Sequence, residues 1–173
     1  MGLDMYLKGK RYLSKYSDET DPTRAEAIQK LFPELEGVNG LWGDNSCVQE
    51  VSIDAGYWRK ANAIHDWFVK NVQGGEDECR PHHVSREDLT ALKTTCEQVL
   101  ADKKLARDLL PTASGFFYGS TEFDQYYFRD LEETVKIVDR CLAMPTAWEF
   151  EYRSSWLKRL DKTAVPCYNT CIH

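Results

Sequence analysis

Residues 57–72 read YWRKANAIHDWFVKNV and carry the clearest helical pattern of the chain. Apolar side chains recur there at spacings of four, three, four and four residues, which places them on one face of a helix. The members of this apolar stripe are Tyr57, Ala61, Ile64, Phe68 and Val72. Because Gly74 and Gly75 follow shortly afterwards and glycines are typical of a helix end, we predict an amphipathic helix over 57–72.

On either side of this helix, three stretches have the pattern of β-strands. Residues 3–8 and 148–153 alternate apolar and polar side chains, as a half-buried strand does. Residues 47–53 are a further strand candidate. We therefore expect a small antiparallel sheet of about three strands.

Start and stop signals predict further helices. Asp21 and Pro22 read as an N-cap followed by a first-turn proline, and the short helix that they begin stops at Pro33. Residues 85–88 (SRED) resemble a capping box with Asp in the Glu position. They begin a helix, or a kinked pair of helices, that ends at Pro111.

A long helix is expected to begin at Ser120 or Thr121 and to reach about Met144. These elements together predict an α+β fold in which the sheet packs against four to five helices. Residues 1–157 are expected to form a single globular domain. Residues 158–173 have no periodicity and are expected to form a loosely ordered tail.

The composition fits a globular domain. The 173 residues are 42% hydrophobic and 29% charged, as in ordinary globular proteins. A net charge of −6 argues against duplex nucleic acid as a partner, because such a surface repels a polyanion. No apolar run could span a membrane and no export signal is present, so we expect a cytoplasmic protein whose six cysteines stay reduced.

Four blocks of sequence resemble a family of small bacteriophage-encoded proteins of unknown activity. They occupy residues 1–7 (MGLDMYL), 56–69 (GYWRKANAIHDWFV), 115–122 (GFFYGSTE) and 152–156 (YRSSW), in the order expected for the family. The resemblance implies a protein that acts in the host cell cytoplasm. Since phage accessory proteins often counter host defence, it also implies a sponge that sequesters a nucleotide immune signal.

Two cations, Arg59 and Lys60, fall in the first turn of the helix predicted over 57–72. The helix dipole disfavours positive charge there by about 0.3–1 kcal/mol. One interpretation is an anion held at this helix start by Arg59 and by free backbone N–H groups. The alternative is a pair of solvated charges that balance the acidic surface.

A second stripe on the same predicted helix contains Trp58, Asn62 and His65. It mixes a ring, an amide and an imidazole, which suits the edge of a ligand pocket. His65 would be the general base if the protein were an enzyme, because the ordinary pKa of histidine lies near neutrality. The alternative is a hydrogen-bonded, half-buried histidine.

Residues 115–121 form an aromatic turn between glycines, with Phe116, Phe117 and Tyr118 in succession. Rings beside a helix start offer stacking for a base, and the backbone there offers N–H donors for a phosphate. Tyr126 would extend this surface along the following helix. The alternative is a hydrophobic plug beneath a loop.

Three other places have suggestive residue types. Arg153 and Trp156 combine a guanidinium with an indole, which suits phosphate binding and stacking as well as ordinary packing. Residues 79–83 (CRPHH) and 167–173 (CYNTCIH) contain ligands that zinc accepts. Because neither has a paired second half at zinc-finger spacing, we expect no metal site, and no cofactor is expected.

These patterns favour a non-catalytic binding protein over an enzyme. Its ligand would be small, anionic and nucleotide-like, with no duplex nucleic acid or membrane as partner, and a homo-oligomer is left open. The ligand-binding residues would be Trp58, Arg59, Asn62, His65, Phe116, Phe117, Tyr118, Ser120, Tyr126, Arg153 and Trp156.

Two alternatives remain open at this stage. One is an enzyme that degrades such a nucleotide by using His65 with a carboxylate. The other is a protein–protein inhibitor of a host factor, whose exposed aromatic side chains are interface hot spots. The binding hypothesis requires residues 56–65 and 115–121 to line one shared cavity.

Overall fold

Antiparallel strands and helices make up an α+β fold in the described part of the chain. The computed structural model describes residues 2–13, 30–32, 34, 48–77, 79–113 and 120–155. The four strands are β1 (Asp4–Tyr12), β2 (Glu50–Arg59), β3 (His82–Val84) and β4 (Glu149–Ser155). The four helices are α2 (Asn62–Asn71), α3 (Arg86–Ala101), α4 (Ala106–Leu109) and α5 (Gln125–Ala143). The 3-10 helix η2 (Lys103–Leu105) joins α3 to α4.

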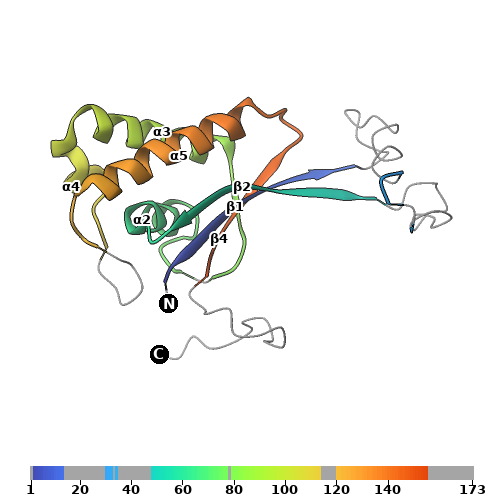
Figure 1. Ribbon diagram of the computed structural model, residues 1–173, viewed down its shortest axis with the longest axis horizontal. Coiled ribbons are helices and arrows are strands. Elements are labelled where there is room, and N and C mark those ends of the chain that lie inside the picture. Colours follow the sequence, from blue (N-terminus) through green and yellow to red (C-terminus); the bar gives the residue numbers. More distant parts are fainter. Residues whose placement is uncertain are drawn as a thin grey trace.

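The strands form one sheet in the order β2-β1-β4-β3, and every neighbouring pair is antiparallel. The helices cover one face of this sheet, with α3 and α5 alongside each other (Figure 1). Beyond the helices, β1 and β2 continue as a two-stranded ribbon (Figure 1). One face of the sheet is therefore packed and the other is open in the described structure.

Strand alternation decides which side chains enter the core. The apolar side chains that β1 buries are Met5 and Leu7, and Leu3 directly before the strand is buried as well. On β4 they are Phe150, Tyr152 and Ser154. The ring of Phe68 from α2 stacks on that of Tyr152, with 3.9 Å between centroids. Helix α2 is thereby fixed against the centre of the sheet.

The helix predicted over 57–72 is wrong in its first part. Gly56 and Trp58 are buried whereas Tyr57 and Arg59 are exposed, so this stretch has the two-residue period of a strand and continues β2. Lys60 ends the strand with a positive φ of 61°, and α2 begins at Asn62. Arg59 and Lys60 therefore precede the helix and do not lie in its first turn.

The prediction for α3 is confirmed, and that for the start of α5 is corrected. Ser85 and Asp88 form a complete capping box, and the kinked continuation through η2 and α4 is present. Helix α5 ends before Met144 as predicted, but Asp124 is its N-cap and accepts the N–H groups of Tyr126 and Tyr127. Asp124 replaces the predicted Ser120 or Thr121 as N-cap because its carboxylate lies directly before the first turn.

The remaining differences concern short or undescribed segments. Strand β3 was missing from the prediction, and β2 begins at Glu50 rather than at residue 47. Most of the predicted short helix before Pro33 lies outside the described residues, and so does the predicted tail over 158–173. Within the described ranges, none of the helices is long and apolar enough to cross a membrane.

Candidate functional site

A cavity of about 320 Å³ lies between the start of α2 and the segment that leads into α5. Its lining comes from three parts of the sequence: the end of β2, the first turn of α2, and residues 120–131. The polar and aromatic residues that matter most for its chemistry are Arg59, Lys60, Asn62, Ser120, Tyr126 and Asp130. Four of the predicted ligand-binding residues, Arg59, Asn62, Ser120 and Tyr126, therefore share one cavity.

The basic wall of the cavity is formed by Arg59 and Lys60, whose side chains are exposed. The positive φ of Lys60 turns the chain from β2 into α2, and its N–H donates to the carbonyl of Leu3 over 2.8 Å. Ala61 is the N-cap of α2 and supplies no side-chain cap. The cations and the first-turn N–H groups together give this wall positive potential.

Asn62 joins the start of α2 to the segment that leads into α5. Its side chain is 4% exposed, and its Nδ2 donates to the carbonyl of Ser120 over 2.8 Å. The chain around 56–65 and the end of the aromatic turn thus meet at the cavity. The three rings Phe116, Phe117 and Tyr118 lie outside the described residues.

The acidic wall comes from Glu122, Asp124 and Asp130. Asp124 is engaged as the N-cap of α5, whereas Asp130 lies further along the helix and is half-buried. Burial raises the pKa of Asp130 to about 6, and repulsion from Glu133 adds to that effect. The cavity therefore carries both positive and negative side chains, and Asp130 takes up a proton more readily than an ordinary aspartate.

An exposed ring stands beside the acidic wall. Tyr126 is 64% exposed and lines the cavity. Its neighbour Tyr127 is turned inward, with its hydroxyl donating to the carbonyl of Leu110 over 2.8 Å. Tyr127 also lines the cavity but is buried, so Tyr126 is the exposed ring among the described lining residues.

The role expected of Trp58 is corrected. Trp58 is only 4% exposed and packs among core residues. Its Nε1 donates to Thr134 Oγ1 over 2.8 Å, and the Thr134 hydroxyl in turn donates to the backbone carbonyl of Asp130. A ring held in this way cannot stack on a ligand without leaving the core. Trp58 therefore contributes to the site indirectly, through its contact with Thr134.

His65 is also a buried residue and does not line the cavity. Its Nδ1 lies 2.8 Å from the hydroxyl of Tyr152, and its Nε2 lies 3.1 Å from Asp77 Oδ2. Ser154 donates to the other oxygen of Asp77 over 2.8 Å. The serine thus bonds to the carboxylate rather than to the imidazole, so the arrangement differs from a serine–histidine nucleophile pair.

Asp77 is the partner of His65 that sequence reasoning missed. Burial opposes its ionisation, but the hydrogen bonds and charge of His65 and the Ser154 hydroxyl hold the pKa of Asp77 below its ordinary value. The residue follows Gly74 and Gly75 in a stretch without periodicity. No local pattern signals such a contact, because it joins a loop to a helix and a strand.

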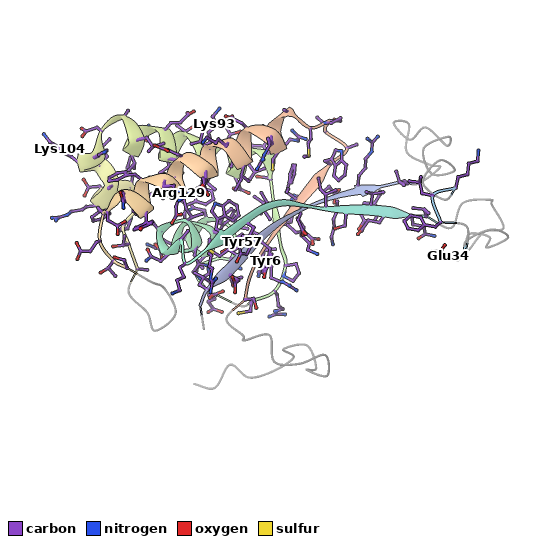
Figure 2. All side chains as sticks on the ribbon, in the orientation of Figure 1. Tyr6, Glu34, Tyr57, Lys93, Lys104 and Arg129 are labelled. Carbon is purple, nitrogen blue, oxygen red and sulfur yellow. The ribbon has the colours of Figure 1, made fainter. Side chains whose placement is uncertain are left out.

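Arg153 lies on the open face of the sheet and is not among the residues that line the cavity. Its guanidinium carbon is 5.8 Å from the ring centroid of Tyr6. Figure 2 shows Tyr6 and Tyr57 next to each other on adjacent strands, and their centroids are 5.4 Å apart. A 2.6 Å hydrogen bond to Asp4 raises the pKa of Tyr57 to about 12. Trp156 lies outside the described residues.

Of the two cysteine–histidine stretches, residues 79–83 lie within the described part of the chain. Among the described residues, no three His, Cys, Asp or Glu side chains are grouped as a metal site. The stretch over 167–173 lies outside them.

Comparisons with models of protein families, with curated proteins and with solved structures found no match for this chain.

Proposed function

We propose that the protein binds a small anionic, ring-containing ligand in the cavity between α2 and α5 and does not alter it chemically. The observation that carries this proposal is the shared cavity of Arg59, Asn62, Ser120 and Tyr126. Two cations and an exposed ring line this one cavity, and these are groups that bind the phosphate and the base of a nucleotide. The ligand is accordingly nucleotide-derived.

The size of the cavity supports a ligand on the scale of one nucleotide. Its volume of about 320 Å³ lies at the lower end of the range for small-molecule sites, roughly 300–1,000 Å³. In the proposed arrangement Arg59 and Lys60 hold the phosphate, and the first-turn N–H groups of α2 add donors. Tyr126 stacks against the base.

Binding without catalysis is favoured by the position of His65. This residue is 1% exposed and is engaged by Tyr152 and Asp77. It is also absent from the cavity lining, so it does not reach a ligand held by Arg59. The resemblance to phage proteins adds a biological setting, in which the protein sequesters a nucleotide that signals in host immunity.

The affinity of the full chain for the four ribonucleoside 5′-monophosphates tests the proposal. By titration calorimetry, Arg59→Glu is expected to weaken binding about tenfold or more, because a phosphate contact is lost and a like charge is added. The matched control is Arg153→Glu, which makes the same charge change at a residue outside the cavity lining and should alter affinity less than about twofold. Equal losses in both variants, or no binding by the unaltered protein, would contradict the proposed site.

A second measurement separates binding from degradation. The protein is incubated with the tightest-binding nucleotide and then denatured, and the released small molecule is identified by mass spectrometry. Recovery of the intact nucleotide is expected. Recovery of a dephosphorylated or cleaved product would instead favour the enzyme alternative.

A further inference from the structure

The two walls of the cavity have opposite charge, and this polarity restricts the ligand further. Arg59 and Lys60 come from the end of β2 and the turn into α2, whereas Glu122, Asp124 and Asp130 come from α5 and the segment before it. Among the described residues, no ion pair engages Arg59 or Lys60. A ligand that is anionic throughout would match only one wall.

Asp130 is the residue of the acidic wall best suited to contact a ligand. It follows the N-cap Asp124 by six positions, which corresponds to about 9 Å along the helix. Its backbone carbonyl accepts from Thr134, and Thr134 accepts from buried Trp58. The backbone of Asp130 is therefore fixed, while no hydrogen bond of the described residues engages its carboxylate.

A half-buried carboxylate gains most from N–H donors, because the water that solvated it has been partly removed. A phosphate near Asp130 would be repelled, so the phosphate belongs at Arg59 and Lys60. The far end of the ligand must then supply donors. Among nucleobases, an exocyclic amino group meets this requirement directly.

We infer that the cavity selects nucleotides whose base carries an exocyclic amino group, with Asp130 as the acceptor of that group. This inference rests on the proposed function, because it assigns the second end of the same ligand. Asp130 then determines which base is preferred, whereas Arg59 and Lys60 bind the phosphate and set the overall affinity. The protein is thereby expected to discriminate between nucleotides of equal charge.

The test compares two ligands that differ only in that group, adenosine 5′-monophosphate and purine riboside 5′-monophosphate. Calorimetry on the full chain at pH 7.5 is expected to give about tenfold tighter binding of the amino-bearing nucleotide, the effect of one hydrogen bond to a charged acceptor. In Asp130→Asn this preference should fall to about threefold or less. The matched control Glu132→Gln removes an exposed charge of α5 outside the cavity lining and should keep the preference.

The outcomes separate this inference from the proposed function. Equal binding of both nucleotides by the unaltered protein overturns the inference and leaves the proposed function standing. Retention of the full preference in Asp130→Asn also overturns it. Failure of both nucleotides to bind contradicts the proposed function and the inference with it. Because the first comparison uses the unaltered chain, it does not depend on whether a variant folds.

Discussion

The side-chain amide of Asn62 donates a 2.8 Å hydrogen bond to the backbone carbonyl of Ser120, 58 positions later in the sequence. Asn62 begins α2, and Ser120 lies four positions before the N-cap of α5. This bond joins the two walls of the cavity, one basic and one acidic. It also shows how two segments that are distant in sequence come to share one site.

Replacing Asn62 with Ala should weaken both the fold and the site. The substitution leaves the Ser120 carbonyl without this donor, at a cost of about 1–3 kcal/mol in the free energy of unfolding. Nucleotide affinity should fall as well, because Ser120 is no longer held against α2. Urea unfolding and calorimetry measure the two effects. Asn71→Ala is the control, since its amide donates to the carbonyl of Trp67 one turn earlier on the same helix. Unchanged affinity in Asn62→Ala would contradict the assignment.

The contact between Asp77 and His65 should make stability depend on pH in the acid range. The folded-state pKa of Asp77 lies below its ordinary value of 3.8, so its ionised form stabilises the fold above that pH. This contribution is lost as the pH falls through the folded pKa. At pH 7 the free energy of unfolding of Asp77→Asn should therefore be about 1–3 kcal/mol lower than that of the unaltered protein. This difference in the free energy of unfolding should narrow below a pH of about 4.

The control for this experiment is Asp66→Asn, which removes an ion pair with Lys70 on the same helix. That pair is partly exposed and should contribute only about 0.3–0.5 kcal/mol. If the two variants lost equal stability at pH 7, the buried hydrogen bonds of Asp77 would not be stabilising the fold.

The packing of β2 against α5 predicts that Gly56 tolerates no side chain. A Cβ atom at this position would lie 2.6 Å from Ile137 Cγ2 and 3.4 Å from Leu7 Cβ. Gly56→Ala should therefore destabilise the fold by about 1–3 kcal/mol through overpacking. Because leucine lacks the Cγ2 methyl group, Ile137→Leu should recover part of the loss. A double-mutant cycle by urea unfolding measures this coupling, and strictly additive effects would contradict the strand assignment at 56–59.

The charge of Asp130 should make phosphate binding depend on pH near neutrality. Ribose 5-phosphate is a suitable probe because it has no base. With a pKa of about 6, Asp130 is mostly charged at pH 7 and mostly neutral at pH 5. At pH 7 the unaltered protein should therefore bind the probe about two- to threefold more weakly than the Asp130→Asn variant does. The difference should vanish at pH 5. A constant ratio across the range would contradict the shifted pKa.

Much of the fold could be predicted from local patterns, and the failures have a physical reason. The capping box at Ser85 and the end of α5 near Met144 depend on neighbours in sequence, and both were confirmed. At 57–61, by contrast, apolar residues at helical spacing coincide with strand alternation. The alternation of buried Trp58 with exposed Tyr57 and Arg59 gives the two-residue period, which the longer helical stripe masked.

The site could be predicted only in part. Arg59, Asn62, Ser120 and Tyr126 were predicted from residue type and do line one cavity. The error over 57–61 placed Trp58 at a pocket edge, whereas a strand turns it into the core. Asp130 was missed because it looks like any acidic residue on an exposed helix. Its significance comes from burial beside a cavity, and burial depends on tertiary packing.

The position of a bound nucleotide tests the central claim most directly. A crystal structure of the protein with adenosine 5′-monophosphate should show the phosphate at Arg59 and Lys60 and the base between Tyr126 and Asp130. A nucleotide bound instead on the open face of the sheet, between Tyr57 and Arg153, would contradict the proposed site.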